Sequence, residues 1–334
     1  MNGNFAFEEP TINCKSCGLN RTTRIKGILN NSQVYLSHPI YGIAMVTCPR
    51  CELHSIEFVH PKVVSRYFDS SKTYYTPEAL IALHNYQTEL CQSQTQYFVN
   101  TLRKPVERIL IIGSGRSLYI QPYKHLSEKL YLIEFVPAFR DWAKTQDGVN
   151  VLEEEDLLDD NLVGKFDVII LTNVLQRVVF VKTFLSRCSR LLNLGGRLVV
   201  EVPITSLDDV RKGCFGSEEL NFFNEESLKS LVINQDSFKV ANMVLDSTLR
   251  DDPSTVKPNR HKINLRPSLK VILNNENPNR EQLILDYNKE ELKSYMKSLS
   301  FGCFIVSNDL SFWSDDQNIK ERELKLSNGN SIGH

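Results

Sequence analysis

Four of the eight cysteines form two CxxC pairs, the spacing of a thiolate metal site. Cys14 and Cys17 come from CKSC, and Cys48 and Cys51 come from CPRC. Each pair lets two thiolates converge on one ion, and two pairs complete the tetrahedral four-sulfur set that zinc favours. Because such a site has no open coordination position, we expect a structural zinc ion, not a catalytic one.

The residues around the two pairs leave alternatives open. Gly18 follows the first pair, where a knuckle can use a positive φ. Three nearby histidines could replace one ligand: His38, His54 and His60. Four independent reduced thiols are a second interpretation. A redox pair is disfavoured, because neither CxxC opens a helix of a βαβ unit.

A second candidate site combines a glycine turn with an acidic residue. The segment RILIIGSGRS, residues 108–117, predicts a buried strand that ends in a turn containing Gly113 and Gly115. Glu134 ends the next apolar run, where a carboxylate can accept hydrogen bonds from both ribose hydroxyls of a nucleoside. The turn lacks the third glycine of the common nucleotide-binding patterns, so a turn without a ligand is the alternative.

The elements that would position these residues alternate between strand and helix after Pro105. Cys188 falls on the apolar face of one predicted helix and is expected in the core, and Asn224 is expected to cap another. This alternation predicts a Rossmann-like α/β fold with a doubly wound, mostly parallel sheet. The strand-like segments are RILIIG, KLYLIEF, FDVIILTNV, RLVVEVP, KVANMVLDS and SLKVIL, and the helical ones are VKTFLSRCSRLLNLGG and NEESLKSLVINQDSF.

Four segments are expected along the chain. Residues 1–62 form the zinc-binding module, and residues 63–103 form a tyrosine-rich helical linker in which Thr76 can cap a helix. The α/β domain spans 104–273, and 274–334 form a helical extension with a polar tail.

Composition limits the function classes. The net charge of −1 gives no overall attraction to nucleic acid or to an anionic membrane. No stretch reaches the roughly 18 apolar residues of a membrane span, and MNGNFAFEEP lacks the features of a secretory signal. We therefore expect a cytoplasmic protein.

The order of these segments resembles that of class I S-adenosylmethionine-dependent methyltransferases. The glycine turn and the acidic second strand are followed by FDVIILTNVLQRV and then by LLNLGGRLVVEVP. With the cysteine pairs ahead of them, the chain is similar to the zinc-containing sugar C-methyltransferases, which act on nucleotide-activated deoxysugars. The segment HKINLRPSLKVIL looks like the HGGSLR segment of that group. The resemblance covers residues 12 to 275.

The resemblance implies a methyltransferase that moves a methyl group by in-line displacement to a small hydroxylated or sugar-like acceptor, including a nucleotide-activated sugar. It implies S-adenosylmethionine as the cofactor. Glu134 would hold the ribose and Asn173 would lie near the sulfonium. Asp156 would lie beside adenine, although Glu155 fits nearly as well. The implied cofactor-binding residues are Gly113, Ser114, Gly115, Glu134, Asp156 and Asn173.

The catalytic base is open at this stage. A nucleophile of high pKa needs a base, and His261 is the first candidate, with Tyr74 and Tyr75 as alternatives. Tyrosine rings could also stabilise a sulfonium, or simply pack between domains. Glu201 could serve as the base or orient a loop.

Several positions depart from the family pattern. Ile111 replaces the usual acid of the first strand, and Gln176 and Arg177 replace a Glu-His pair. Arg266 and Pro267 replace two glycines. These departures motivate a second hypothesis, a degenerate methyltransferase fold that acts as a scaffold. A nicotinamide-dependent oxidoreductase ranks last, because a Tyr-x-x-x-Lys pair is missing.

Overall fold

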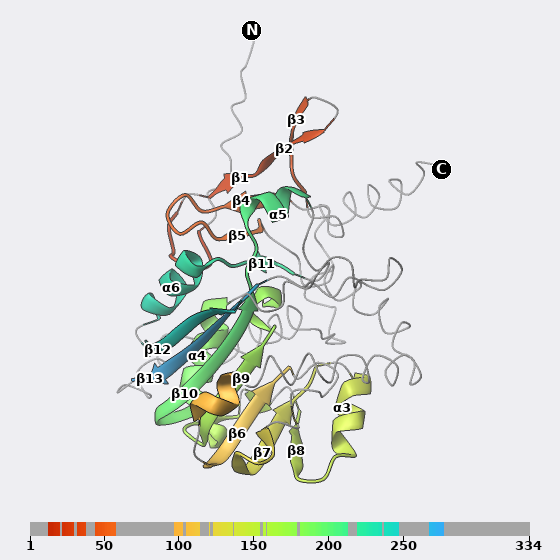
Figure 1. The fold of residues 1–334 in the computed structure, drawn as a ribbon, viewed down its shortest axis with the longest axis vertical. Coiled ribbons are helices and arrows are strands. Elements are labelled where there is room, and N and C mark those ends of the chain that lie inside the picture. The colour runs from red at the N-terminus through yellow and green to blue at the C-terminus, as the bar shows by residue number, and fades with distance from the viewer. Residues whose placement is uncertain are drawn as a thin grey trace, which may run out of the picture.

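A computed structural model shows a small layer of antiparallel strands beside a larger twisted sheet (Figure 1). The structure describes residues 13–20, 22–29, 32–37, 44–57, 97–102, 105–113, 120, 123–135, 137–153, 156–157, 159–178, 181–212, 219–235, 237–246 and 267–276.

The larger sheet has seven strands in the order β12-β13-β10-β9-β6-β7-β8. β13 is antiparallel to both of its neighbours, whereas all other pairs in the sheet are parallel. Six strands therefore point the same way, which confirms the predicted mostly parallel α/β sheet. The strands are β6 Val106–Ile112, β7 Ser127–Ile133, β8 Val149–Leu152, β9 Phe166–Thr172, β10 Leu192–Pro203, β12 Phe238–Asp246 and β13 Ser268–Asn275.

The direction of winding reverses at β6. From β6 the chain adds β7 and β8 on one side, and then returns to add β9 and β10 on the other. In an open α/β sheet, the crevice at such a reversal, beyond the carboxyl ends of the strands, is the usual ligand site. For this strand order, a ligand site is therefore expected beyond the adjoining ends of β6 and β9.

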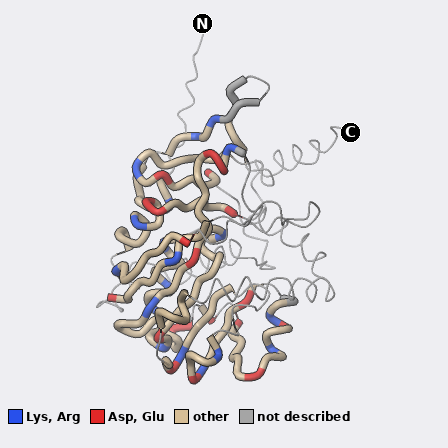
Figure 2. The backbone as a smooth tube through the Cα atoms, in the orientation of Figure 1, with Lys and Arg blue, Asp and Glu red and all other residues tan. Residues whose placement is uncertain are grey.

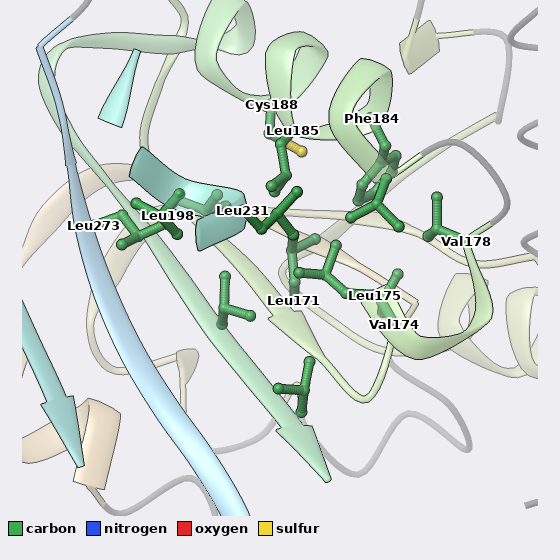
Figure 3. Close-up of a cluster of buried hydrophobic side chains, with 14 of the residues drawn as sticks. Leu171, Val174, Leu175, Val178, Phe184, Leu185, Cys188, Leu198, Leu231 and Leu273 are labelled. Carbon is green, nitrogen blue, oxygen red and sulfur yellow. The ribbon is translucent and has the colours of Figure 1, made fainter. Parts of the chain in front are cut away.

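Alternation along the strands produces two buried layers. One layer contains Leu171 and Val200 and is covered by α4, Val181–Leu191, and α6, Glu225–Ile233 (Figure 3). Cys188 of α4 is fully buried in this layer, as predicted. The opposite layer contains Ile111, Ile170 and Val199, and it is covered by α3, Pro137–Lys144, and by helical residues 97–102.

Local signals explain where α6 begins. Asn224 accepts a hydrogen bond from the backbone N–H of Ser227, and the Ser227 side chain closes a capping box. This confirms the predicted cap. The remaining short helices are η4 Asp160–Leu162, η5 Leu175–Arg177 and α5 Leu207–Lys212.

The smaller layer is completed by a strand from much later in the chain, β11. Its order is β1-β4-β5-β11, and β11 belongs to the connection between α5 and α6. A separate hairpin joins β2 to β3. The strands are β1 Thr23–Arg24, β2 Lys26–Leu29, β3 Ser32–Tyr35, β4 Met45–Thr47, β5 His54–Ile56 and β11 Asn221–Phe222.

Candidate functional sites

The two cysteine pairs converge. The Sγ atoms of Cys14 and Cys51 lie 3.6 Å apart, and those of Cys17 and Cys48 lie 3.5 Å apart. All four Sγ atoms lie within 4.8 Å of one another. With Zn–S bonds of about 2.3 Å, the edge of a regular tetrahedron is about 3.8 Å. The four sulfurs therefore have the spacing that a tetrahedral zinc ion needs.

Matching turns shape the two knuckles. The N–H of Gly18 donates to the Cys14 carbonyl, and the N–H of Glu52 donates to the Cys48 carbonyl, both at 3.0 Å. Gly18 has φ +72° and Glu52 has φ +55°. The positive φ predicted at Gly18 is confirmed. The second knuckle places a glutamate in the same left-handed region, which is unfavourable for residues other than glycine.

Burial makes the thiolates depend on a cation. The hydrogen bond between their thiols raises the pKa of Cys14 and lowers the pKa of Cys51 to about 5. Burial raises the pKa of Cys48. Four thiolates this close together, three of them buried, would repel one another without a cation, so this donor set fits a divalent metal.

His54 is not part of this cluster. Its Nδ1 lies 2.9 Å from the Thr47 hydroxyl, and burial together with Arg211 lowers its pKa to about 4. Within the described ranges, the group able to hold a metal consists of the four cysteines alone. The alternative ligands His38 and His60 lie outside the described residues.

The first knuckle is fixed to α6. The hydroxyl of Ser16, which is fully buried, donates to the Ser227 carbonyl at 2.6 Å. The ammonium of Lys15 donates to the Ile56 carbonyl at 3.2 Å. Since Ser227 lies in the first turn of α6, the cysteine cluster and the larger sheet share one packed region.

The end of β6 requires glycine. Gly113 has φ +70°, and its N–H donates to the Ile133 carbonyl at 2.8 Å. A Cβ atom at this position would lie 2.9 Å from Cγ2 of Val174. Gly113 is thus the point where β6 turns, beside the residues that follow β9.

The carboxyl ends of β7 and β9 supply two predicted residues. Glu134 follows β7 and is 2 % exposed. Asn173 follows β9 with φ +55°, and its N–H donates to the Glu201 carbonyl at 2.9 Å. Both lie at the edge of the sheet where the winding reverses, together with Gly113.

Asp156 lies in a loop that α4 holds in place. Its carboxylate accepts the N–H of Glu153 at 2.8 Å. The Arg187 guanidinium donates to the carbonyls of Leu157 and Asp159. Burial and the neighbouring Arg190 lower the pKa of Arg187 to about 10. The other predicted site residues lie outside the described residues: Tyr74, Tyr75, Ser114, Gly115, Glu155 and His261.

The sequence analysis identified only one member, Glu201, of a buried polar group at this edge. Glu201 of β10 is fully buried and accepts a hydrogen bond from the Ser268 hydroxyl at 2.8 Å. Burial raises its pKa to about 7. Its Oε2 atom, the Thr172 hydroxyl and the Tyr123 hydroxyl are buried and have no hydrogen-bond partner within the described part of the chain. A polar residue directly after the unbroken apolar run VIIL was the signal that could have found Thr172.

The positions that depart from the family pattern have structural surroundings. Ile111 is 1 % exposed within the layer under α3. Gln176 is buried, and its backbone carbonyl accepts the N–H of Leu220 at 2.7 Å. These residues pack the fold at places where the family has charged groups.

A comparison with protein families decides the class of the central domain. Residues 110–200, which run from β6 through β10, match a family model described as a methyltransferase domain. This part of the chain is an S-adenosylmethionine-dependent methyltransferase domain. The match covers the reversal point of the sheet with Gly113, Glu134 and Asn173.

Several solved methyltransferase structures are similar to this chain at low sequence identity. The N-methyltransferase NodS from Bradyrhizobium japonicum is 14% identical, with a TM-score of 0.40, over 57% of this chain and 99% of that chain. A Burkholderia thailandensis 1,6-didemethyltoxoflavin-N1-methyltransferase is 15% identical, with a TM-score of 0.44, over 70% of this chain and 96% of that chain. A Leishmania major SAM-dependent methyltransferase is 13% identical, with a TM-score of 0.48, over 76% of this chain and 98% of that chain. With TM-scores this low, the class rests on the domain match and the sheet order.

Three further findings complete the comparison and the description of the chain. A comparison with curated proteins gives no match. Among the described residues, no helix is long and apolar enough to cross a membrane. Basic and acidic residues are interspersed along the described chain (Figure 2).

Proposed function

We propose that this methyltransferase transfers a methyl group to a small hydroxylated or sugar-like acceptor, including a nucleotide-activated sugar. The observation that carries the proposal is the winding reversal of the sheet. There, Gly113, Glu134 and Asn173 directly follow the three neighbouring parallel strands β6, β7 and β9. The interspersed charges in Figure 2 disfavour a nucleic-acid acceptor.

The residues at the reversal fit S-adenosylmethionine, which supplies an already activated methyl group on its sulfonium. The missing side chain of Gly113 allows the backbone to turn beside a ligand. Glu134 would accept hydrogen bonds from the ribose hydroxyls, and Asn173 would lie near the reacting centre. Ser114, Gly115 and Asp156 would complete the cofactor site.

The chain's task in this reaction is alignment and removal of water from the nucleophile. A hydroxyl nucleophile also needs a proton acceptor. The sequence offers four candidates for this role: His261, Tyr74, Tyr75 and Glu201.

We also propose that Cys14, Cys17, Cys48 and Cys51 hold one zinc ion with a structural role. The support is the tetrahedral spacing of the four sulfurs and their burial beside the sheet. Such an ion would neutralise the thiolates and fix both knuckles against the domain.

Calorimetry with S-adenosylmethionine and S-adenosylhomocysteine tests the proposed function. We expect both to bind the wild-type chain, and Glu134→Gln to weaken binding at least tenfold because the ribose contact is weakened. Glu128→Gln, at the exposed amino end of β7, is the matched control and should bind normally. Absence of binding at millimolar ligand would favour the scaffold hypothesis.

A transfer assay then tests the acceptor class. The wild-type chain is incubated with methyl-labelled S-adenosylmethionine and a set of nucleoside diphosphate 6-deoxyhexoses. We expect label in the sugar fraction. Cofactor binding without transfer to any hydroxylated acceptor would contradict the proposed acceptor class.

A further inference from the structure

The polar residues at the ends of β9 and β10 lie in one row across the sheet. Ile111 of β6 is paired with Ile170 of β9, so Gly113 is level with Thr172 two residues further along. Thr172 is paired with Glu201, and Glu201 with Lys270 of β13. With neighbouring strands about 4.8 Å apart, Glu201 lies about 10 Å across the sheet from Gly113.

These side chains share one face of the sheet. Ile170 and Val199 belong to the buried layer under α3 and residues 97–102, and so does Tyr123. Successive strand residues point to opposite faces, so Thr172 and Glu201, two positions further on, point to this same layer. The otherwise apolar layer therefore becomes polar near the carboxyl ends of the parallel strands, where the ligand site is expected.

Three atoms of this group have no hydrogen-bond partner among the residues that the structure describes. They are Oε2 of Glu201 and the hydroxyl oxygens of Thr172 and Tyr123, all of them buried. Buried polar atoms are nearly always paired with protein, water or ligand. A carboxylate oxygen that accepts, next to hydroxyls that can donate, is complementary to a hydroxyl group of a ligand.

The neighbouring cation, the Lys270 ammonium, is paired with another carboxylate, so Glu201 is available to accept a proton. The Lys270 ammonium contacts Asp246 of β12 at 2.6 Å and lies 5.8 Å from the ring centroid of Tyr97. Lys270 lowers the pKa of Glu201 and Asp246 raises it, but burial is the largest effect. The carboxyl group therefore titrates near neutral pH, the range in which a general base works best.

We propose that Glu201 accepts the proton of the acceptor hydroxyl, and that Thr172 and Tyr123 complete the subsite for that hydroxyl. This inference rests on the proposed function. The O–H proton passes to Oε2 of Glu201 while the acceptor oxygen bonds to the methyl carbon. The bond from this carbon to sulfur breaks, and its electron pair stays on sulfur, which becomes a neutral thioether.

The test measures the pKa of Glu201 with two ligands that differ in charge. Protein carrying carbon-13 in its glutamate carboxyl groups is titrated by NMR, and Glu201→Gln assigns the signal. S-adenosylmethionine carries a positive sulfonium, and S-adenosylhomocysteine does not. If Glu201 faces the reacting centre, its pKa is at least half a unit lower with S-adenosylmethionine. Glu107 and Glu128, at the amino ends of β6 and β7, are controls with no such difference.

Ser268→Ala gives a second readout. Removing the hydrogen bond to Oε1 raises the pKa of Glu201 with both ligands, while the difference between the ligands is retained. Binding of both ligands without a difference at Glu201 overturns this inference alone. Failure of both ligands to bind overturns the proposed function as well, and calorimetry on the same samples separates the two results.

Discussion

At the scale of single residues, two glycines test what the turn after β6 requires. Gly113 and Gly148 both have positive φ, but a Cβ atom at Gly148 would contact nothing within 4 Å. We expect Gly148→Ala to lower the free energy of unfolding by about 1 kcal/mol, from backbone strain alone. Gly113→Ala should cost about 2 to 3 kcal/mol, because the methyl group also meets Val174. Urea unfolding of both variants measures the difference, and equal losses would contradict the close packing.

The knuckles offer the opposite experiment. Glu52 adopts the left-handed conformation that Gly18 adopts in the first knuckle. Glu52→Gly should therefore raise the free energy of unfolding by about 1 kcal/mol, and Gly18→Ala should lower it by a similar amount. Thermal unfolding of the zinc-loaded variants measures both. A destabilised Glu52→Gly would show that the Glu52 side chain matters more than its backbone strain.

At the scale of elements, the capping box of α6 links a helix to the cysteine cluster. Asn224→Ala should lower the free energy of unfolding by about 1 kcal/mol, because the N–H of Ser227 loses its acceptor. Asn234→Ala, at the other end of α6, is the matched control and should change stability less. Urea unfolding compares the two, and equal effects would argue against the cap.

β10 gives the stability a pH dependence through Glu201. The folded pKa of about 7 lies above the ordinary value of 4.5, so the folded chain holds this proton more tightly than the unfolded chain. The resulting contribution of Glu201 to the free energy of unfolding is about 3 kcal/mol. It is fully present below pH 4.5 and is lost as the pH rises through 7. Comparing wild type with Glu201→Gln in urea at pH 5 and pH 8 isolates it. A variant with the same pH dependence as wild type would contradict a buried, proton-holding Glu201.

The elements that sequence patterns predicted are those with strong local signals. The apolar runs of β6, β9 and β10 and the Asn224 cap could be recognised without a structure. The segment from α3 to β8 was missed, because PAFRDWAK and VNVL are only eight and four residues long. The pairing of β11 with β5 and the row from Thr172 to Lys270 depend on contacts between distant strands, which no local pattern reveals.

At the scale of the whole molecule, the cysteine cluster and the sheet share one buried layer. Cys14, Cys48 and Cys51 belong to the same hydrophobic cluster as Leu171 of β9. Removing zinc should therefore destabilise the methyltransferase domain as well as the small layer, by several kcal/mol. We expect one zinc ion per chain by metal analysis, and a lower unfolding temperature after chelation. Less than half an equivalent of zinc, or an unchanged unfolding temperature, would contradict this role.

The central claim is that a nucleoside lies across the carboxyl ends of β6 and β7, with its ribose held by Glu134. A crystal structure with S-adenosylhomocysteine tests this claim most directly. The account predicts both ribose hydroxyls within hydrogen-bond distance of the Glu134 carboxylate and the backbone of Gly113 beside the ligand. A ligand bound elsewhere, or a Glu134 carboxylate turned away from the ribose, would contradict it.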